Sequence, residues 1–219
     1  MIRKEPSDVI LKKSILISFS TVLIALGITL FLQSRLGSDP ITVWIDGLRL
    51  SLALPMGTAS LYNNLVMLAL AILFARKYIH IGTVIGAVVT GPLMNLFDPV
   101  ILKIFGADPR LGTRIGMMLL GQVVLCYAIA LNLSVKFGFG TVDSLLVRLC
   151  EKFRLKYKVI KMLSDLIYTI AGILLGGVFG FGSVISVLTG GPLIAWFMEK
   201  FTEPMAHQLH LNENPIREE

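Results

Sequence analysis

The side chains that could do chemistry in this chain are polar groups inside long apolar segments. Asp165 is the only acid well inside such a segment, and a carboxylate at membrane depth is costly enough to indicate a functional site. Amides and hydroxyls at similar depth could hydrogen-bond a ligand. The candidate residues for binding a small solute are Asp165, Ser164, Asn64, Asn63, Asn95, Thr90 and Thr189.

Each of these residues also has a structural interpretation. Lys161 lies one helical turn before Asp165 and could pair with it while the lysine stem reaches toward the membrane surface. Adjacent amides can join helices by hydrogen bonds, and the hydroxyls of Thr90 and Thr189 can support a kink. The sequence leaves the binding role and the structural role open for both groups.

Patterns typical of enzymes are missing from the sequence. It contains no P-loop, no HExxH-like helix and no recognisable pairing of a nucleophile with a base. His207 and His210 form an i, i+3 pair in the polar tail, which is weak evidence for a metal. We therefore expect no enzymatic activity, no catalytic residue, no cofactor and no metal site.

Composition identifies the element type that must carry these residues. The chain is 55% hydrophobic and only 16% charged, with a mean hydropathy of +0.79, whereas about a quarter of the residues of a soluble domain are charged. About 20 apolar residues cross a bilayer. The uncharged runs are 14–34, 50–75, 81–97, 115–135 and 166–198, and glycines at 176–182 divide the last. The prediction is an all-α membrane protein with six transmembrane helices.

Charge sets the orientation of these helices. With six spans and a cytoplasmic N-terminus, fifteen of the 20 Lys and Arg residues fall on the cytoplasmic side and five outside. Both termini are therefore predicted to be cytoplasmic. The net charge of +6 could suggest nucleic-acid binding, but the basic run at 148–161 is better explained by topology and contact with anionic headgroups. We expect the lipid bilayer, and no nucleic acid, as partner.

An internal repeat connects the two halves of the chain. Residues 81–100 return one hundred positions later as 181–200, with seven identical pairs and Thr83 opposite Ser183. The repeat includes a Gly-Pro pair in the middle of each apolar segment, which a helix interior normally excludes. We interpret Gly91, Pro92, Gly191 and Pro192 as hinge or kink positions. Two interrupted segments at matching places indicate a transporter-type binding site at the bilayer midplane.

Each half also contains a short amphipathic segment, at 41–54 and 142–155, too short and too charged to span. Three spans per half is an odd number, so the second half is predicted to be inverted relative to the first. The predicted parts are a cytoplasmic segment 1–13, repeats 14–106 and 107–201, and a polar cytoplasmic tail 202–219. Glycine-rich turns begin the amphipathic helices, with Asp39 as a helix cap before Pro40. The turn residues are Gly37, Asp39, Thr42, Gly138, Gly140 and Asp143.

These turns, the paired Gly-Pro spans and the length make the chain resemble the YczE/YyaS/YitT-type bacterial membrane proteins. Members of that family typically carry Gly-Pro-x-Asp at the turn. The first copy here keeps the proline as Pro40 but has Thr42 for the acid, and the second has Thr141 for the proline but keeps Asp143. The resemblance implies a multi-pass protein of the bacterial inner membrane, with a transporter as its expected activity.

Two classes of function fit these observations. The first is a secondary transporter that binds a small solute between inverted halves, which rock about it. The second is a substrate-binding membrane subunit of a larger uptake complex. A dimeric channel is a third interpretation, because two inverted halves can line a pore. The partner is then a small-molecule solute, alone or together with a second copy or a membrane partner subunit.

Overall fold

The computed structural model describes residues 7–209 and 211, apart from 136, 139 and 156, and all its regular elements in this part of the chain are helical. Residues 1–6, 210 and 212–219, which include parts of the predicted N-terminal segment and tail, lie outside the described residues. The elements are α1 (Ser7–Ser34), α2 (Pro40–Leu52), α3 (Met56–Phe74), the 3-10 turn η1 (Arg76–Tyr78), α4 (Ile81–Phe105), α5 (Leu111–Val135), α6 (Thr141–Phe153), α7 (Tyr157–Leu174), α8 (Phe181–Phe197), the π-helical turn η2 (Met198–Thr202) and α9 (Glu203–Gln208).

Five helices are long and apolar enough to cross a membrane: Asp8–Ser34, Met56–Phe74, Ile81–Phe105, Leu111–Val135 and Phe181–Gln208. Large apolar side chains cover their outer surfaces, for example Leu73 at 73% exposure and Phe181 at 69%. Such a surface is unfavourable in water but matches the hydrocarbon core of a bilayer. In that environment the backbone N–H and C=O groups must be hydrogen-bonded within the protein, and helices achieve this. The predicted all-helical membrane protein is confirmed at this level.

Helix α7 is the element expected to form a sixth span. It has 18 residues and begins at Tyr157, nine residues before the uncharged run that starts at 166. Lys158, Lys161 and Asp165 therefore belong to the helix itself, which gives it a higher density of charged residues than the five long helices. The extension places Asp165 near the middle of the helix.

Three boundaries differ from the sequence prediction. The run 50–75 contains a break, because Ala53 adopts a left-handed conformation and Pro55 precedes the start of α3. The third uncharged run was predicted to end at 97, but Asp98 and Pro99 lie inside α4, which continues to Phe105. Finally, the last helix passes through the π-helical turn η2 into α9 and does not end near Met198.

The prolines of the repeat do not break their helices. Pro92 lies inside α4 and Pro192 inside α8, which corrects the predicted interruption of these segments. Backbone groups in an apolar environment are best satisfied within one helix, so the ladder continues around each proline. The hydroxyls of Thr90 and Thr189 donate to carbonyls one turn earlier in the same helices, at 2.6 Å and 2.8 Å.

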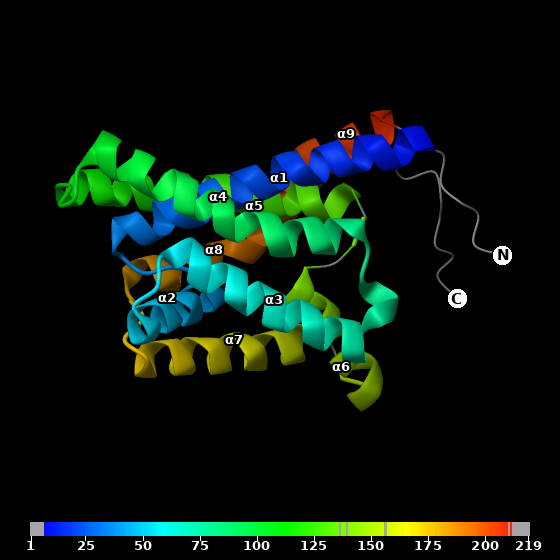
Figure 1. Cartoon of the computed structure of the whole chain (residues 1–219). Helices are drawn as coiled ribbons and strands as arrows, with labels where there is room; N and C mark the ends of the chain where they lie inside the picture. The colour runs from blue at the N-terminus through cyan, green and yellow to red at the C-terminus, as the bar shows by residue number, and fades with distance from the viewer. Residues whose placement is uncertain (1–6, 136, 139, 156, 210, 212–219) are drawn as a thin grey trace.

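Several helix contacts occur in both halves, although α3 also packs on α4 without a comparable contact between α7 and α8 in the described part of the chain (Figure 1). Helices α1 and α5 pack against each other, α4 packs on α1, and α8 packs on α5. The short helices cross over, because α2 packs on α7 and α6 packs on α3. Figure 1 shows α2 and α6 toward opposite ends of the molecule, with the start of α1 and α9 at the same end as α6.

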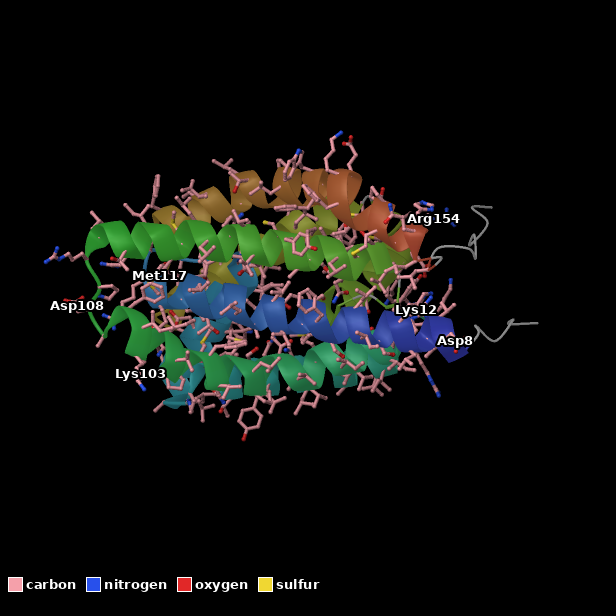
Figure 2. All side chains as sticks on the ribbon, turned by 90° about the horizontal axis from the view of Figure 1, so that it is seen from above. Asp8, Lys12, Lys103, Asp108, Met117 and Arg154 are labelled. Carbon is pink, nitrogen blue, oxygen red and sulfur yellow. The ribbon has the colours of Figure 1, made fainter. Side chains whose placement is uncertain are left out.

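Charged residues gather at the two ends of the helix bundle. Figure 2 shows Asp8, Lys12 and Arg154 near one end and Lys103 and Asp108 at the other. This is the distribution expected where the ends of the helices meet the two aqueous faces of a membrane.

The short helix α2 turns its polar face into the protein. Thr42 and Asp46 are buried at 2% and 3% exposure, whereas Leu50 and Leu52 are about half exposed, at 47% and 59%. An amphipathic helix on a soluble domain would be oriented the other way. Helix α2 is therefore a packed part of the bundle, held between α3 and α7, and its polar residues can contribute to an internal site.

Candidate functional site

Asp165 forms an ion pair with Lys161 one turn earlier on α7. The two charged atoms, Lys161 Nζ and Asp165 Oδ1, are 2.9 Å apart, and the side chains are 33% and 30% exposed. Helical i, i+4 spacing places both side chains on one face. The pairing with Lys161 that the sequence analysis considered for Asp165 is thus present. The residues around the pair decide whether Asp165 can also bind a ligand.

Two further carboxylates act on this pair. The charges of Asp39 and Asp143 interact with both Lys161 and Asp165. Asp39 caps α2 and accepts hydrogen bonds from the backbone N–H and the hydroxyl of Thr42, at 3.3 Å and 2.6 Å. Asp143 lies in the first turn of α6 and accepts a 2.9 Å hydrogen bond from the Tyr157 hydroxyl. The turns of both halves therefore bring an acid to α7.

Among the described residues, this ionic cluster of Asp39, Asp143, Lys161 and Asp165 carries more negative than positive charge. It contains three carboxylates and one ammonium. The starts of α2 and α6 each add about half a positive charge near Asp39 and Asp143. About one negative charge stays uncompensated, which suits the binding of a cation.

Aromatic residues and a buried amide lie beside the cluster. The ring centroids of Trp44 and Tyr168 are 6.3 Å apart, and the Tyr168 hydroxyl interacts electrostatically with Lys161 and Asp165. The indole N–H of Trp44 donates to Asn63 Oδ1 at 3.1 Å. Asn63 is buried, and its Nδ2 has no hydrogen-bond partner among the described residues. Of the two predicted asparagines, Asn63 is the buried one and Asn64 is half-buried.

A second buried amide lies between α5 and α8. Gln122 Nε2 donates to the Thr189 hydroxyl at 3.1 Å, while its Oε1 has no partner within the described part of the chain. One turn later, the thiol of Cys126 donates a 3.8 Å hydrogen bond to the carbonyl of Gly190 and interacts electrostatically with Asp39. Gln122 was missed from the sequence, although an amide within the uncharged run 115–135 was a usable signal.

Asn95 has a structural role. Its side chain accepts from the Gly57 backbone N–H at 2.8 Å and donates to the Thr58 hydroxyl at 3.1 Å, so it satisfies the free start of α3. Helices α3 and α4 touch here without side chains between them, since a Cβ on Gly91 would lie 2.4 Å from the Gly57 carbonyl oxygen. The matching position in α8, Gly191, has no such neighbour within 4 Å.

The glycine-rich turns dock on the opposite halves of the chain. Gly37, at φ +94°, lies against Gly180 and Ser183 at the start of α8, and the Gly182 N–H donates to the Leu36 carbonyl at 2.7 Å. Gly138, at φ +124°, lies against His80 and Thr83 at the start of α4. These positive φ angles and close approaches require glycine. The turns thereby fix where α2 and α6 begin, and with them Asp39 and Asp143. Gly140 immediately precedes α6.

A cavity of about 490 Å³ opens near the first turn, between α1, α2, α4 and the start of α3. Gly37 and Ser38 belong to its wall, so it reaches the turn that ends in Asp39. Its polar contacts include a hydrogen bond from Gln33 to Asp98 and the buried Asp46, which pairs with Arg49 at 2.9 Å and accepts from the Val178 N–H at 3.0 Å. Other wall residues are Thr29, Arg35, Leu50, Met56, Met94 and Leu102.

Of the predicted site residues, Gly37 is part of this cavity wall, and Ser164 lines a separate apolar groove between α6 and α7. The structure thus pairs Asp165 with Lys161 under the charges of Asp39 and Asp143, and it sets Asn63 beside Trp44. Asn95 bridges α4 to α3, and Thr90 bonds within α4. Gln33, Asp46 and Asp98 were not expected to face a cavity, because amphipathicity alone does not reveal which face of a short helix is covered.

At the opposite end, Glu151 of α6 connects to the loop before α4. The Tyr78 hydroxyl donates to Glu151, whose carboxylate also lies 3.7 Å from Lys77 and 3.3 Å from Arg148. Burial, and then the hydrogen bond to Glu151, raises the pKa of Tyr78 to about 12. The contact with Tyr78 in turn lowers the pKa of Glu151.

The apolar helices and the charged interior define a multi-pass membrane protein. The chain belongs to the DUF6198 family, a family of unknown function whose model matches residues 11–199. It is 27% identical over 180 residues to an uncharacterized protein of Haemophilus influenzae, covering 82% of this chain and 80% of the relative.

Two relatives from Bacillus subtilis cover similar lengths. The uncharacterized membrane protein YczE is 24% identical over 192 residues, or 86% of this chain and 84% of YczE. The uncharacterized protein YyaS is 26% identical over 194 residues, or 88% of this chain and 93% of YyaS. The expected family resemblance is confirmed by these matches. No solved structure matches the chain.

Proposed function

We propose that the protein has six membrane spans arranged as two inverted halves. The contacts of the two short helices support this arrangement, because α2 of the first half packs on α7 of the second and α6 of the second half packs on α3 of the first. The positions of α2 and α6 toward opposite ends of the molecule support it as well (Figure 1). In this arrangement α7 is the sixth span, and the side chains of its Lys161–Asp165 pair are about two-thirds covered by the protein. An intramembrane ion pair shielded in this way is tolerated.

The proposed function is transport of a small solute that binds at the ionic cluster between the halves. The observation that carries the proposal is the Lys161–Asp165 pair on α7, on which the charges of Asp39 and Asp143 act from the starts of α2 and α6, so that both halves contribute. Unpaired carboxylate charge inside a membrane protein is a feature of ion and substrate pathways. The excess negative charge favours a cationic solute.

We propose that the cavity near Asp39 leads toward this cluster, because Gly37 and Ser38 of its wall directly precede Asp39. Its volume of about 490 Å³ lies within the range of small-molecule sites, about 300–1,000 Å³. Its wall includes Leu102, which is adjacent to Lys103, and Lys103 lies with Asp108 at the end of the molecule opposite to Lys12 and Arg154 (Figure 2). The predicted charge asymmetry places the cavity on the outer side of a bacterial inner membrane and both termini in the cytoplasm.

The test is solute uptake by the purified protein in lipid vesicles, first with a panel of small amines and matched anions. Asp165→Asn should abolish uptake of the amine that the wild type carries, while the protein keeps its elution profile and thermal stability. If Asp165 serves only to neutralise Lys161, the double variant Asp165→Asn with Lys161→Gln should recover full uptake, because it removes the unpaired ammonium as well. Full recovery would refute the role of Asp165 in binding.

The same assay separates the alternative functions. A substrate-binding subunit of a larger uptake complex would bind the amine without carrying it across the vesicle membrane. A channel would pass it at a rate that does not saturate with concentration. Saturable uptake by the protein alone is the result expected of a transporter.

A further inference from the structure

An apolar groove of about 590 Å³ runs between α6 and α7. It shares no wall residue with the cavity near Asp39, and no residue of the ionic cluster lines it, although Tyr168 lies beside both the groove and the cluster. Its walls are almost entirely aliphatic and aromatic. Several of these side chains are largely uncovered, with Phe153 at 58%, Leu163 at 52% and Ile167 at 66% exposure. The remaining wall residues include Val142, Leu145, Leu149, Leu155, Ile160 and Tyr168.

Basic side chains lie in the last turns and at the C-cap of α6, which forms one wall of this groove. Arg148, Lys152 and Arg154 are all exposed, and Arg148 is engaged by Glu151 at 3.3 Å. Lys152 and Arg154 have no carboxylate within 4.0 Å among the described residues. The ammonium of Lys152 lies 5.7 Å above the ring of Phe153, which is itself part of the groove wall. The uncompensated positive charge therefore lies at the edge of an apolar channel.

The position of this edge matches a membrane surface. Arg154 lies at the same end of the molecule as Asp8 and Lys12 (Figure 2). An apolar groove that starts at the level of lipid headgroups and runs along a membrane helix fits an acyl chain, and basic residues near a bilayer surface attract anionic headgroups. A zwitterionic lipid would fill the groove equally well, but its own ammonium offsets its phosphate and weakens the attraction to Lys152 and Arg154.

We propose that this groove binds one anionic phospholipid, with an acyl chain between α6 and α7 and the phosphate at Lys152 and Arg154. The inference does not depend on transport, because no residue of the ionic cluster takes part. It gives the basic run at 148–161 a ligand in addition to its contribution to topology.

The experiment is native mass spectrometry of the full chain in an uncharged detergent, with added phosphatidylglycerol or phosphatidylcholine. The wild type should retain one phosphatidylglycerol in preference to phosphatidylcholine. Each basic residue contributes about 1 kcal/mol near a lipid surface, so Lys152→Gln with Arg154→Gln should weaken retention about 30-fold. Lys103→Gln, an exposed lysine at the opposite end, is the matched control and should have no effect.

A second variant tests the groove without changing charge. Leu163→Trp should fill the groove and release the lipid, whereas Leu73→Trp on the exposed surface of α3 should not. Equal retention of both lipids by the wild type, or undiminished phosphatidylglycerol binding by the double charge variant, would overturn the proposal. A mass corresponding to a dimer that is disrupted by Leu163→Trp would assign the groove to a second copy of the chain and would likewise overturn it.

Discussion

The contact between α3 and α4 makes a sharp prediction about two glycines at matching positions of the internal repeat. Gly91→Ala should destabilise the protein, whereas Gly191→Ala should not. A Cβ on Gly91 would meet the Gly57 carbonyl oxygen at 2.4 Å and Leu61 Cβ at 2.8 Å, but a Cβ on Gly191 would meet nothing within 4 Å. Both substitutions are chemically identical and lie immediately before a proline in an apolar helix.

The size of the effect follows from the contacts that must move. Ordinary van der Waals contact begins at 3.4 Å, so α4 has to retreat from α3 by about 1 Å. Overpacking of this kind costs about 1–3 kcal/mol. The same retreat stretches the 2.8 Å hydrogen bond from the Gly57 N–H to Asn95, and its loss adds about 0.5–1.5 kcal/mol. The gain in helix propensity from Gly to Ala is common to both variants, so the difference between them is about 1.5–4.5 kcal/mol.

Chemical unfolding of the purified variants in detergent, followed by helical circular dichroism, measures this difference. Gly91→Ala should unfold at a clearly lower denaturant concentration than Gly191→Ala, with a similar dependence on denaturant. Asn95→Ala should lower stability by only the hydrogen-bond share of the effect. Equal stabilities for the Gly91 and Gly191 variants would refute the close packing of α3 on α4.

Two further predictions concern the cytoplasmic side of the proposed topology. Glu151→Gln removes the Glu151 charge and should lower the pKa of Tyr78 from about 12 toward its ordinary value of 10. Phenolate absorbance measures this pKa, and Tyr78→Phe identifies the contribution of Tyr78. An unchanged titration would contradict the contact between the two residues. Because the folded pKa is raised, Tyr78 contributes stability that is present below pH 10 and lost as the pH rises through 12. A cysteine introduced at Glu219 should be protected from an impermeant thiol reagent in intact cells, and labelling from outside would rule out a cytoplasmic C-terminus.

The sequence was sufficient for the elements and for the class of protein. Uncharged runs of spanning length predicted the five long helices, and the segments 41–54 and 142–155 predicted α2 and α6 to within two residues at each end. Glycine positions also predicted the turn between α7 and α8, where Gly176 takes a positive φ. These features are local, because length, hydropathy and backbone conformation depend on neighbours along the chain.

The composition of the site depends on packing between distant segments and was only partly predictable. Asp39 was expected to act as a helix cap, and nothing in its local sequence indicated that α2 would lie against α7 and Asp165. Asn63 and Asn64 differ by one step around a helix, and only the placement of Trp44 makes Asn63 the buried amide. The polar face of α2 was visible in the pattern, but in a membrane protein the same pattern permits burial of either face.

The crossed docking of the two turns has a consequence for biosynthesis. The turn at Gly37 packs against the start of α8, and the turn at Gly138 packs against the start of α4. Each half therefore buries the start of a helix that belongs to the other half. During translation the first four helices are made before the turn at Gly138 and the start of α8 exist. The start of α4, which is buried in the complete protein, is therefore uncovered at that stage. Residues 1–106 produced alone should then be a target for membrane proteolysis, and co-production with residues 107–219 should protect both fragments.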